Sequence, residues 1–272
     1  MRACHNARMS AVTILGFGRL GSAIARGVVR SGALQATDLV AVDADPARVA
    51  EANAMGIRTM PIEQALAEAC RVLVAVKPQA FGTVTAHRAR LHANTTVISV
   101  MAGWSRAAIA RELGATHVIR AMPTVAATVG ASTTALSMGP EVPAAEANFA
   151  RTLFGAIGPV IEIDESHLDA ATACGASGVA YACLFIEAME AAATRMGVPA
   201  AAARAFAVSA AEGAAAAWRH GQVPPADLRA SVTSPAGTTA AALAVLQQGG
   251  FESLLERAAI AARDRARELG VR

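Results

Sequence analysis

The sequence predicts an α/β protein in which a doubly wound, mainly parallel sheet is followed by an all-helical domain. Through residue 163, short apolar runs alternate with helical segments, which is the pattern of βαβ units. After Ile163 the strand signal ends and helical stretches follow one another. The third observation is an early glycine-rich turn between a strand and a helix, since such a turn opens many sheets of this class. We therefore expect one domain over residues 1–163 and a second over residues 164–272.

The expected strands are short runs rich in β-branched residues. One runs from Val12 into the glycine-rich turn, and Asp45-Pro46 opens a helix after the next strand, because proline suits a first helical position. Apolar runs of this length between helices indicate a parallel sheet covered on both faces. The other expected strands are Leu39–Val42, Val72–Val76, Val97–Val100, Val118–Ala121 and, with a weaker signal, Thr133–Ser137 and Val160–Ile163.

The second domain is expected to consist of helices separated by glycine and proline stops. The segment Val179–Met196 is apolar almost all round, which indicates burial on every side. A domain of about 110 residues can hardly enclose such a helix alone, so we expect it to pack against a second subunit. The expected helices are Glu165–Ala173, Val179–Met196, Ala200–Arg219, Thr239–Gln248 and Phe251–Leu269.

The early turn has the spacing G-x-G-x-x-G. In a Rossmann-type domain the first glycine makes the tight turn, the second admits the pyrophosphate and the third lets the helix pack on the strand. The next strand ends at an acid about twenty residues further on, where a carboxylate meets the ribose hydroxyls. The alternative is a coincidental glycine loop. The predicted cofactor contacts here are Gly16, Phe17, Gly18, Arg19, Leu20, Gly21 and Asp43.

Asp43 also bears on the choice of cofactor. A carboxylate accepts hydrogen bonds from a ribose diol and repels a 2′-phosphate, which favours NADH over NADPH. Arg48 on the next helix would offset part of this effect. We expect NADH or NADPH, with a lean towards NADH.

Further loops follow the strands at the edge where doubly wound sheets bind ligands. Lys77 is the one lysine against 23 arginines, and it stands where a loop would face the nicotinamide ribose. The alternative is an ordinary surface lysine. A glycine at 103 would let the backbone approach the ring, or would make only a tight turn. The predicted contacts of these loops are Ala75, Val76, Lys77, Pro78, Ala102, Gly103, Met122, Pro123 and Thr124.

A second glycine-containing turn, Ser231–Thr239, precedes the helical run Thr239–Gln248. The first N–H groups of a helix lack internal partners and lie at the positive end of its dipole. Such a turn can hold a small carboxylate, with Ser and Thr hydroxyls adding hydrogen bonds. The alternative is an ordinary helix N-cap, for which Ser and Thr are common.

Composition excludes several classes of protein. The net charge of +3, without a basic block, does not favour nucleic-acid binding. The four cysteines show no C-x-x-C pairing, so we expect reduced core thiols and neither a disulfide framework nor a metal site. Residues 1–10 lack an apolar core, which indicates no signal peptide, and Met9 is an alternative start. Val179–Ile186 is too short to span a bilayer. We expect a soluble, cytoplasmic protein that binds no membrane.

Together these segments resemble pyrroline-5-carboxylate reductase over nearly the whole chain. The resemblance implies an NAD(P)H-dependent enzyme that reduces the cyclic imine Δ1-pyrroline-5-carboxylate to L-proline, and a dimer with interlocked helical domains, often assembled into a ring. The matching segments are Gly16–Gly21, Ala75–Pro78, Ala102-Gly103, Ile119–Pro123, Ser177–Tyr181, Phe185–Ala188, Val232–Thr239 and Ala244–Phe251.

The departures from the family pattern gather around the imine pocket. The family's Asn after Met-Pro is Thr124, its Pro after Ser-Gly is Val179, and a glycine of the late turn is Ala236. A Glu common shortly before that turn is Gln222, and a usual Asp is Ala230. Two interpretations remain: a proline-pathway enzyme with tolerated drift, which we favour, or a paralogue that reduces a related cyclic imine.

The mechanistic hypothesis places the substrate at the late turn. Backbone N–H groups around Ala236–Thr238 hold its carboxylate, and the Thr239 hydroxyl orients the ring nitrogen and relays a proton. Helix capping is the alternative role of Thr239. Ser177 and Ser234 add polar contacts.

Two rival classes remain. A 3-hydroxyacid dehydrogenase would place a lysine in the helical domain, but no lysine follows residue 77. A non-enzymatic nucleotide sensor would tolerate the change at Thr124.

Overall fold

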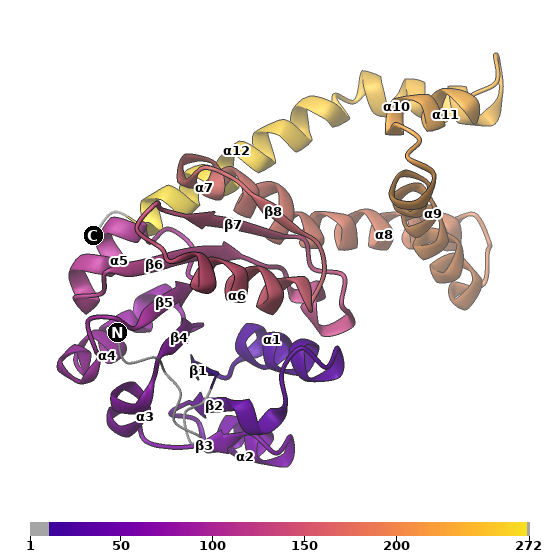
Figure 1. The fold of residues 1–272 in the computed structure, drawn as a ribbon. Coiled ribbons are helices and arrows are strands. Elements are labelled where there is room, and N and C mark those ends of the chain that lie inside the picture. Colours follow the sequence, from indigo (N-terminus) through magenta and orange to yellow (C-terminus); the bar gives the residue numbers. More distant parts are fainter. Residues whose placement is uncertain (1–10, 271–272) are drawn as a thin grey trace. The chain divides into compact units, whose positions relative to one another are not determined.

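The computed structural model describes residues 11–270, and the expectations about the native start concern residues outside this range. Eight strands form one sheet in the order β3-β2-β1-β4-β5-β6-β7-β8 (Figure 1). The strands are β1 (Val12–Leu15), β2 (Leu39–Val42), β3 (Arg58–Thr59), β4 (Arg71–Val74), β5 (Thr96–Ser99), β6 (His117–Met122), β7 (Thr134–Met138) and β8 (Val160–Glu162).

All neighbouring strands are parallel except β6 and β7. The 123–133 connection between these two contains only the short 3₁₀ segment Val125–Val129, whereas a parallel crossover needs a longer connection, usually with an α-helix. The doubly wound, mainly parallel sheet is therefore confirmed. The two-residue strand β3 was not expected, because two residues give no periodic signal.

Helices cover both faces of the sheet and give it two cores. One core joins Phe17 and Ile24 to Phe154, and the other joins Leu15 and Leu66 to Ile109. These helices are α1 (Arg19–Arg30), α2 (Pro46–Ala54), α3 (Ile62–Glu68), α4 (Phe81–Thr85), α5 (Arg106–Leu113) and α6 (Ala144–Gly155).

The second half of the described chain is helical, as expected, with one helix more than the sequence suggested. That helix is the short α10. In place of the expected helix Glu165–Ala173 the chain forms a 3₁₀ turn, a short helix and a π-helical turn, Thr172–Ala176, that leads into α8. The helices are α7 (Leu168–Ala171), α8 (Gly178–Arg195), α9 (Ala200–Gly221), α10 (Pro225–Ser231), α11 (Thr238–Gln248) and α12 (Phe251–Gly270).

The chain divides into two compact units. The sheet unit runs to Ala176 and includes the end of the chain from Ala262, and the helical unit is Ser177–Ala261. The first segment of the sheet unit therefore ends at Ala176, whereas the sequence predicted a boundary at residue 164. The reason is that Leu168 is fully buried against Met122 and Ala135 of the sheet.

The helical unit has almost no interior within one chain. Only Ala203 and Ala207 are buried between residues 177 and 261, and α8 contains no buried residue. Large side chains such as Leu184, Phe206 and Val245 are about two-thirds exposed. Helices α8 and α9 pack on each other, but the apolar surface that remains requires another partner.

Two expectations about these segments need correction. The helical run Glu165–Arg195 is 31 residues long and by length and composition could cross a membrane, so the shortness of Val179–Ile186 alone does not exclude a span.

The cysteine expectation is also wrong in part. Cys70 is disulfide-bonded, and Cys174 and Cys183 are free but exposed, because the helical run that carries them is largely uncovered.

Candidate functional site: a dinucleotide cavity and a late helix turn

The glycine turn after β1 has a different physical requirement at each glycine. Gly16 has a φ of +93°, and a Cβ there would lie 2.9 Å from the backbone of Ala75 and Val76. A Cβ at Gly21 would collide with the carbonyl oxygen of Gly16. Gly18 is the N-cap of α1 with a φ of −72°, and a Cβ at this position would meet no heavy atom within 4 Å. The packing of the chain explains why positions 16 and 21 require glycine, while the space beside Gly18 is available to a ligand.

The carboxylate of Asp43 is fixed against this turn. Its Oδ2 accepts a 2.6 Å hydrogen bond from the backbone N–H of Phe17, and its Oδ1 accepts one of 2.9 Å from the N–H of Asp45. The ring of Phe17 is fully buried in the core. Phe17 therefore acts at this site through its backbone, and Asp43 ties the end of β2 to the glycine turn.

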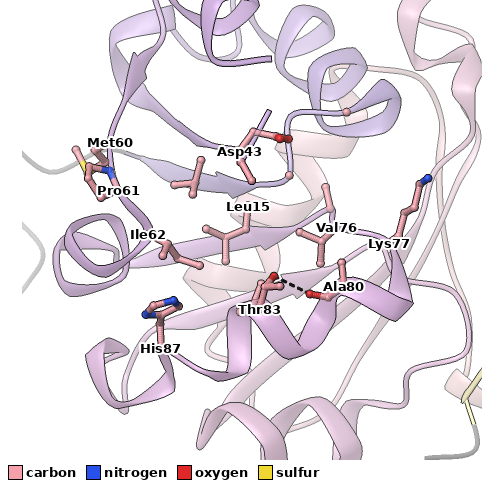
Figure 2. A pocket seen from close by; sticks show the side chains of 16 residues that line it. Leu15, Asp43, Met60, Pro61, Ile62, Val76, Lys77, Ala80, Thr83 and His87 are labelled. Carbon is pink, nitrogen blue, oxygen red and sulfur yellow. Dashed lines mark hydrogen bonds between the residues drawn. The ribbon is translucent and has the colours of Figure 1, made fainter. Parts of the chain in front are cut away.

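A cavity of about 520 Å³ opens between these elements (Figure 2). Six of the residues predicted to bind the cofactor line it: Gly16, Gly18, Asp43, Ala75, Val76 and Lys77. In Figure 2, Lys77 and His87 lie on opposite sides of the cavity, with Leu15, Ile62 and Val76 between them. A groove with an apolar middle and polar ends suits an adenosine and its phosphates.

Sequence reasoning missed one side of this cavity. Residues 60–62 follow β3, and residues 80–87 lie on the segment after β4. The rule that ligands meet the carboxyl ends of strands would have found the first group if β3 had been recognised. The missed lining residues are Leu15, Val42, Ala44, Met60, Pro61, Ile62, Ala80, Thr83, Val84 and His87.

The loops after β5 and β6 lie at the same edge of the sheet as the cavity, because β1, β4, β5 and β6 run parallel. Gly103 has a φ of +80°, and a Cβ there would lie 2.6 Å from the carbonyl oxygen of Ala266. The packing of α12 against this loop explains why residue 103 is a glycine without involving a ligand. Pro78 lines a separate small cavity with Trp104.

The segment Met122-Pro123-Thr124 is buried. The hydroxyl of Thr124 accepts a 3.2 Å hydrogen bond from the N–H of Ala126, and its own N–H donates to the Ser132 hydroxyl at 2.8 Å. Thr124 thus stabilises the turn that follows β6. Arg19 and Leu20 open α1 beside Gly18.

An ionic cluster joins β6, the start of α5 and the segment after β8. Glu165 accepts hydrogen bonds from the backbone N–H of Arg106 at 2.6 Å, from Arg106 Nε at 3.0 Å and from Arg120 Nη1 at 3.2 Å. The side chain of Arg120 is 5% exposed. Burial acts to raise the pKa of Glu165, but the hydrogen bonds from Arg106 and Arg120 outweigh it, so the pKa lies below its usual range. Glu165 therefore holds the start of the helical region on β6 as a charged group.

The late turn belongs to the helical unit, whereas the cavity residues belong to the sheet unit. Gly237 is the N-cap of α11, and its N–H donates to the carbonyl oxygen of Ser234 at 3.0 Å. Thr238 and Thr239 are the first two helical residues, and the N-cap residue Gly237 has no side chain to cap this end. Thr239 is therefore not the N-cap of the helix.

Ala236 in this turn has a φ of +57°, one of two positive-φ non-glycine residues in the described chain besides Gln222. That conformation costs a residue with a Cβ about 1 kcal/mol or more. Ser177 is the N-cap of α8.

Within residues 11–270, no group of three or more His, Cys, Asp or Glu side chains is placed to hold a metal ion.

Two family models match parts of the chain. Residues 165–269 match the family model for pyrroline-5-carboxylate reductase dimerisation, and residues 11–103 match the model for NADP oxidoreductase, coenzyme F420-dependent. The chain is 37% identical to pyrroline-5-carboxylate reductase of Thermus thermophilus over 264 residues, which is 95% of this chain and 98% of that protein.

Solved structures show the same fold. A pyrroline-5-carboxylate reductase from Coxiella burnetii is 28% identical, with a TM-score of 0.87 over 97% of this chain and 100% of that one. The Plasmodium falciparum pyrroline carboxylate reductase with NADP bound is 23% identical, with a TM-score of 0.87 over 96% of this chain and 98% of that one. The identity to the Thermus protein over nearly the whole length shows that the chain belongs to the pyrroline-5-carboxylate reductase family.

Proposed function

We propose that this protein reduces Δ1-pyrroline-5-carboxylate to L-proline with NAD(P)H. The observation that carries the proposal is the open space at Gly18, at the uncapped start of α1 and beside the cavity that Asp43 and Lys77 line. A dinucleotide pyrophosphate fits such a helix start, and the cavity has the size of a small-molecule site. Family membership directs the chemistry towards a cyclic imine.

The cofactor, when bound, supplies a hydride for the imine carbon. The chain's own part is to hold both reactants, because hydride transfer requires a short and aligned approach. Gly18 admits the pyrophosphate in the turn that Gly16 and Gly21 allow to form, and Asp43 receives the ribose hydroxyls. The loops that contain Lys77, Gly103 and Thr124 border the nicotinamide end.

The substrate carboxylate is proposed to bind the late turn. The N-cap of α11, Gly237, has no side chain to cap the first N–H groups, and such groups suit a small anion. In the turn Ala236–Thr238 the Gly237 N–H already donates to the Ser234 carbonyl oxygen, so the Thr238 N–H would bind the carboxylate. Ser177 and Ser234 add hydroxyls, and the Thr239 hydroxyl orients the ring nitrogen. The pyrroline nitrogen gains its proton from solvent or through Thr239.

A related cyclic imine is the second candidate substrate. The positive φ of Ala236 supports it, since the extra methyl group narrows a turn in which the family usually has glycine. The other departures are Thr124, Val179 and Gln222. Among these, Gln222 ends α9 in a left-handed conformation.

One assay separates these possibilities. NADH and NADPH oxidation would be followed with pyrroline-5-carboxylate, with a piperideine carboxylate and with a hydroxyacid/ketoacid pair. Fastest turnover of pyrroline-5-carboxylate is expected. Preference for the piperideine carboxylate would favour a paralogue that reduces a related cyclic imine. Activity only with the hydroxyacid/ketoacid pair would overturn the reductase proposal.

The protein self-associates through its helical region. The matched dimerisation model covers residues 165–269, where large apolar side chains of α8 and α9 are exposed in the single chain. We further propose a dimer that can assemble into a ring and binds neither membrane nor nucleic acid. A cytoplasmic location and a functional boundary between residues 163 and 164 complete the proposal.

A further inference from the structure

The end of α12 packs backbone against backbone on the loop after β5. The last residues of this helix, from Ala262 to Gly270, belong to the sheet unit together with that loop. A Cβ at Gly103 would lie 2.6 Å from the carbonyl oxygen of Ala266 and 2.7 Å from the backbone nitrogen of Gly270. A Cβ at Gly270 would in turn collide with the carbonyl oxygen of Gly103. The contact therefore requires glycine on both sides, since backbone atoms cannot rotate away as a side chain could.

The same end of the helix also faces the loop after β4. Ala266 is buried, so the helix turns a small side chain towards the sheet unit. A cavity of about 190 Å³ separates the two final turns of α12 from the loops after β4 and β5. It is lined by Pro78, Gln79, Trp104, Arg265, Glu268 and Leu269. The end of α12 is thus placed beside both loops that we expect to border the nicotinamide.

Trp104 extends this contact to the wall of the dinucleotide cavity. Its ring meets the ring of Phe81 edge-on, with the centroids 4.6 Å apart and an angle of 68° between the planes, which is a preferred geometry for an aromatic pair. Phe81 is buried and begins α4. Ala80, Thr83 and Val84, on either side of Phe81 in the sequence, line the dinucleotide cavity. Contacts therefore continue from α12 through the loop after β5 to the cavity wall.

We propose that the last turn of α12, through Ala266 and Gly270, positions the Met101–Trp104 loop against the nicotinamide half of the bound dinucleotide. The proposal rests on the dinucleotide role proposed for the cavity. Ala266 and Gly270 are positioning residues, because they act on the ligand through the loop. Hydride transfer requires an aligned approach, and a displacement of about 1 Å can cost about 100-fold in rate. Release of the loop from α12 should therefore weaken binding of the nicotinamide half and slow turnover.

The test compares a ligand that reaches this loop with one that does not. NADH carries the nicotinamide riboside, whereas ADP ends at the diphosphate proposed to lie at Gly18. Binding of each to the full-length protein would be measured by calorimetry at one protein concentration, with NADPH in place of NADH if the wild type binds it more tightly. Gly270→Ala should raise the Kd for NADH by about fivefold or more. The Kd for ADP should stay within about twofold, as expected for a distant site.

Turnover gives a second measurement. At saturating NADH, kcat for pyrroline-5-carboxylate should fall by roughly 10- to 100-fold in Gly270→Ala. Ala266→Leu replaces this variant if it does not fold, since leucine favours helix and its larger side chain overpacks the same contact.

Gly158→Ala is the matched control for a loss of stability alone. Gly158 has a φ of +141°, and a Cβ there would collide with the carbonyl oxygen of Ser132, so the substitution strains the same unit. It precedes β8, at the edge of the sheet opposite to β3 and far from the loop after β5. This control should lower Tm and leave the ratio of the two Kd values unchanged.

A wild-type ratio of Kd values in both Gly270→Ala and Ala266→Leu would overturn the proposal. An equal change of the ratio in Gly158→Ala would overturn it too, because the effect would then follow from lost stability. Failure of the wild type to bind NADH, NADPH and ADP would count against the dinucleotide site and with it this proposal. Binding of the dinucleotide without turnover of pyrroline-5-carboxylate would contradict the proposed function only, since the Kd ratio tests the positioning by itself.

Discussion

Replacing Gly16 with alanine should destabilise the sheet unit before it affects any ligand. The left-handed φ of +93° costs a residue with a Cβ about 1–2 kcal/mol. The new methyl group would also lie 2.9 Å from backbone atoms of Ala75 and Val76, which cannot rotate away as a side chain could. Overpacking of this kind adds about 1–3 kcal/mol. We expect a loss of roughly 2–5 kcal/mol, a large part of the stability of an ordinary domain.

Gly18→Ala is the matched variant with the opposite outcome. Gly18 has a φ of −72°, and a Cβ added to it would have no heavy atom within 4 Å, so the apoprotein should be unchanged or stabilised by about 0.4–1 kcal/mol. The methyl group would instead occupy the space proposed for the pyrophosphate. A cost of about 1–3 kcal/mol for such crowding weakens ADP-ribose binding by roughly 5- to 150-fold.

The assay is thermal unfolding of both apoproteins at one protein concentration, followed by calorimetric titration with ADP-ribose. Gly16→Ala should lower Tm by roughly 4–20 °C, at about 2–4 °C per kcal/mol for a chain of this size. Gly18→Ala should keep Tm and lose affinity. If Gly18→Ala binds ADP-ribose as the wild type does, the space beside Gly18 does not hold the pyrophosphate.

Three further predictions concern the ionic cluster and the late turn. Glu165→Gln should cost on the order of 2 kcal/mol, the value of a hydrogen bond to a charged group, and should reduce acid sensitivity. The lowered pKa of Glu165 gives stability that is present above its unfolded pKa of about 4.3 and is lost as pH falls through the lower folded value. The unfolding curves of wild type and variant should therefore converge as pH falls below about 4.3. Parallel curves would contradict this. Ala236→Gly should leave Tm within about 3 °C of the wild-type value, because relief of the positive φ and the added freedom of the unfolded chain nearly cancel. Turnover of pyrroline-5-carboxylate should rise in this variant. Unaltered turnover would show that the Ala236 methyl group does not narrow the substrate site. Thr239→Val should lower kcat by about tenfold or more with ADP-ribose affinity unchanged, and unaltered steady-state kinetics would remove Thr239 from the mechanism.

The sheet unit shows which features a sequence can predict. The G-x-G-x-x-G turn and Asp43 were predictable because strand, turn and acid recur at fixed spacing, and the structure places Gly16, Gly18 and Asp43 at one cavity. His87 and Met60 were not predictable in the same way. Their place at the cavity depends on how the segments after β3 and β4 fold in three dimensions. Gly103 illustrates the converse case, because its close approach to Ala266, far along the chain, leaves no local signal in the sequence.

The helical unit shows a different limit, because its stability depends on more than one chain. The sequence predicted a subunit contact from the all-round apolar character of Val179–Met196, and α8 has no buried residue within the single chain. Leu184 and Phe185 are 66% and 40% exposed, and full burial of such side chains contributes about 1.5–3 kcal/mol each. A helical hairpin that leaves this burial unused is poorly stable alone, so subunit association contributes directly to folding. The unfolding temperature of the wild type should therefore rise with protein concentration, which is why the comparison of Gly16→Ala with Gly18→Ala requires one fixed concentration.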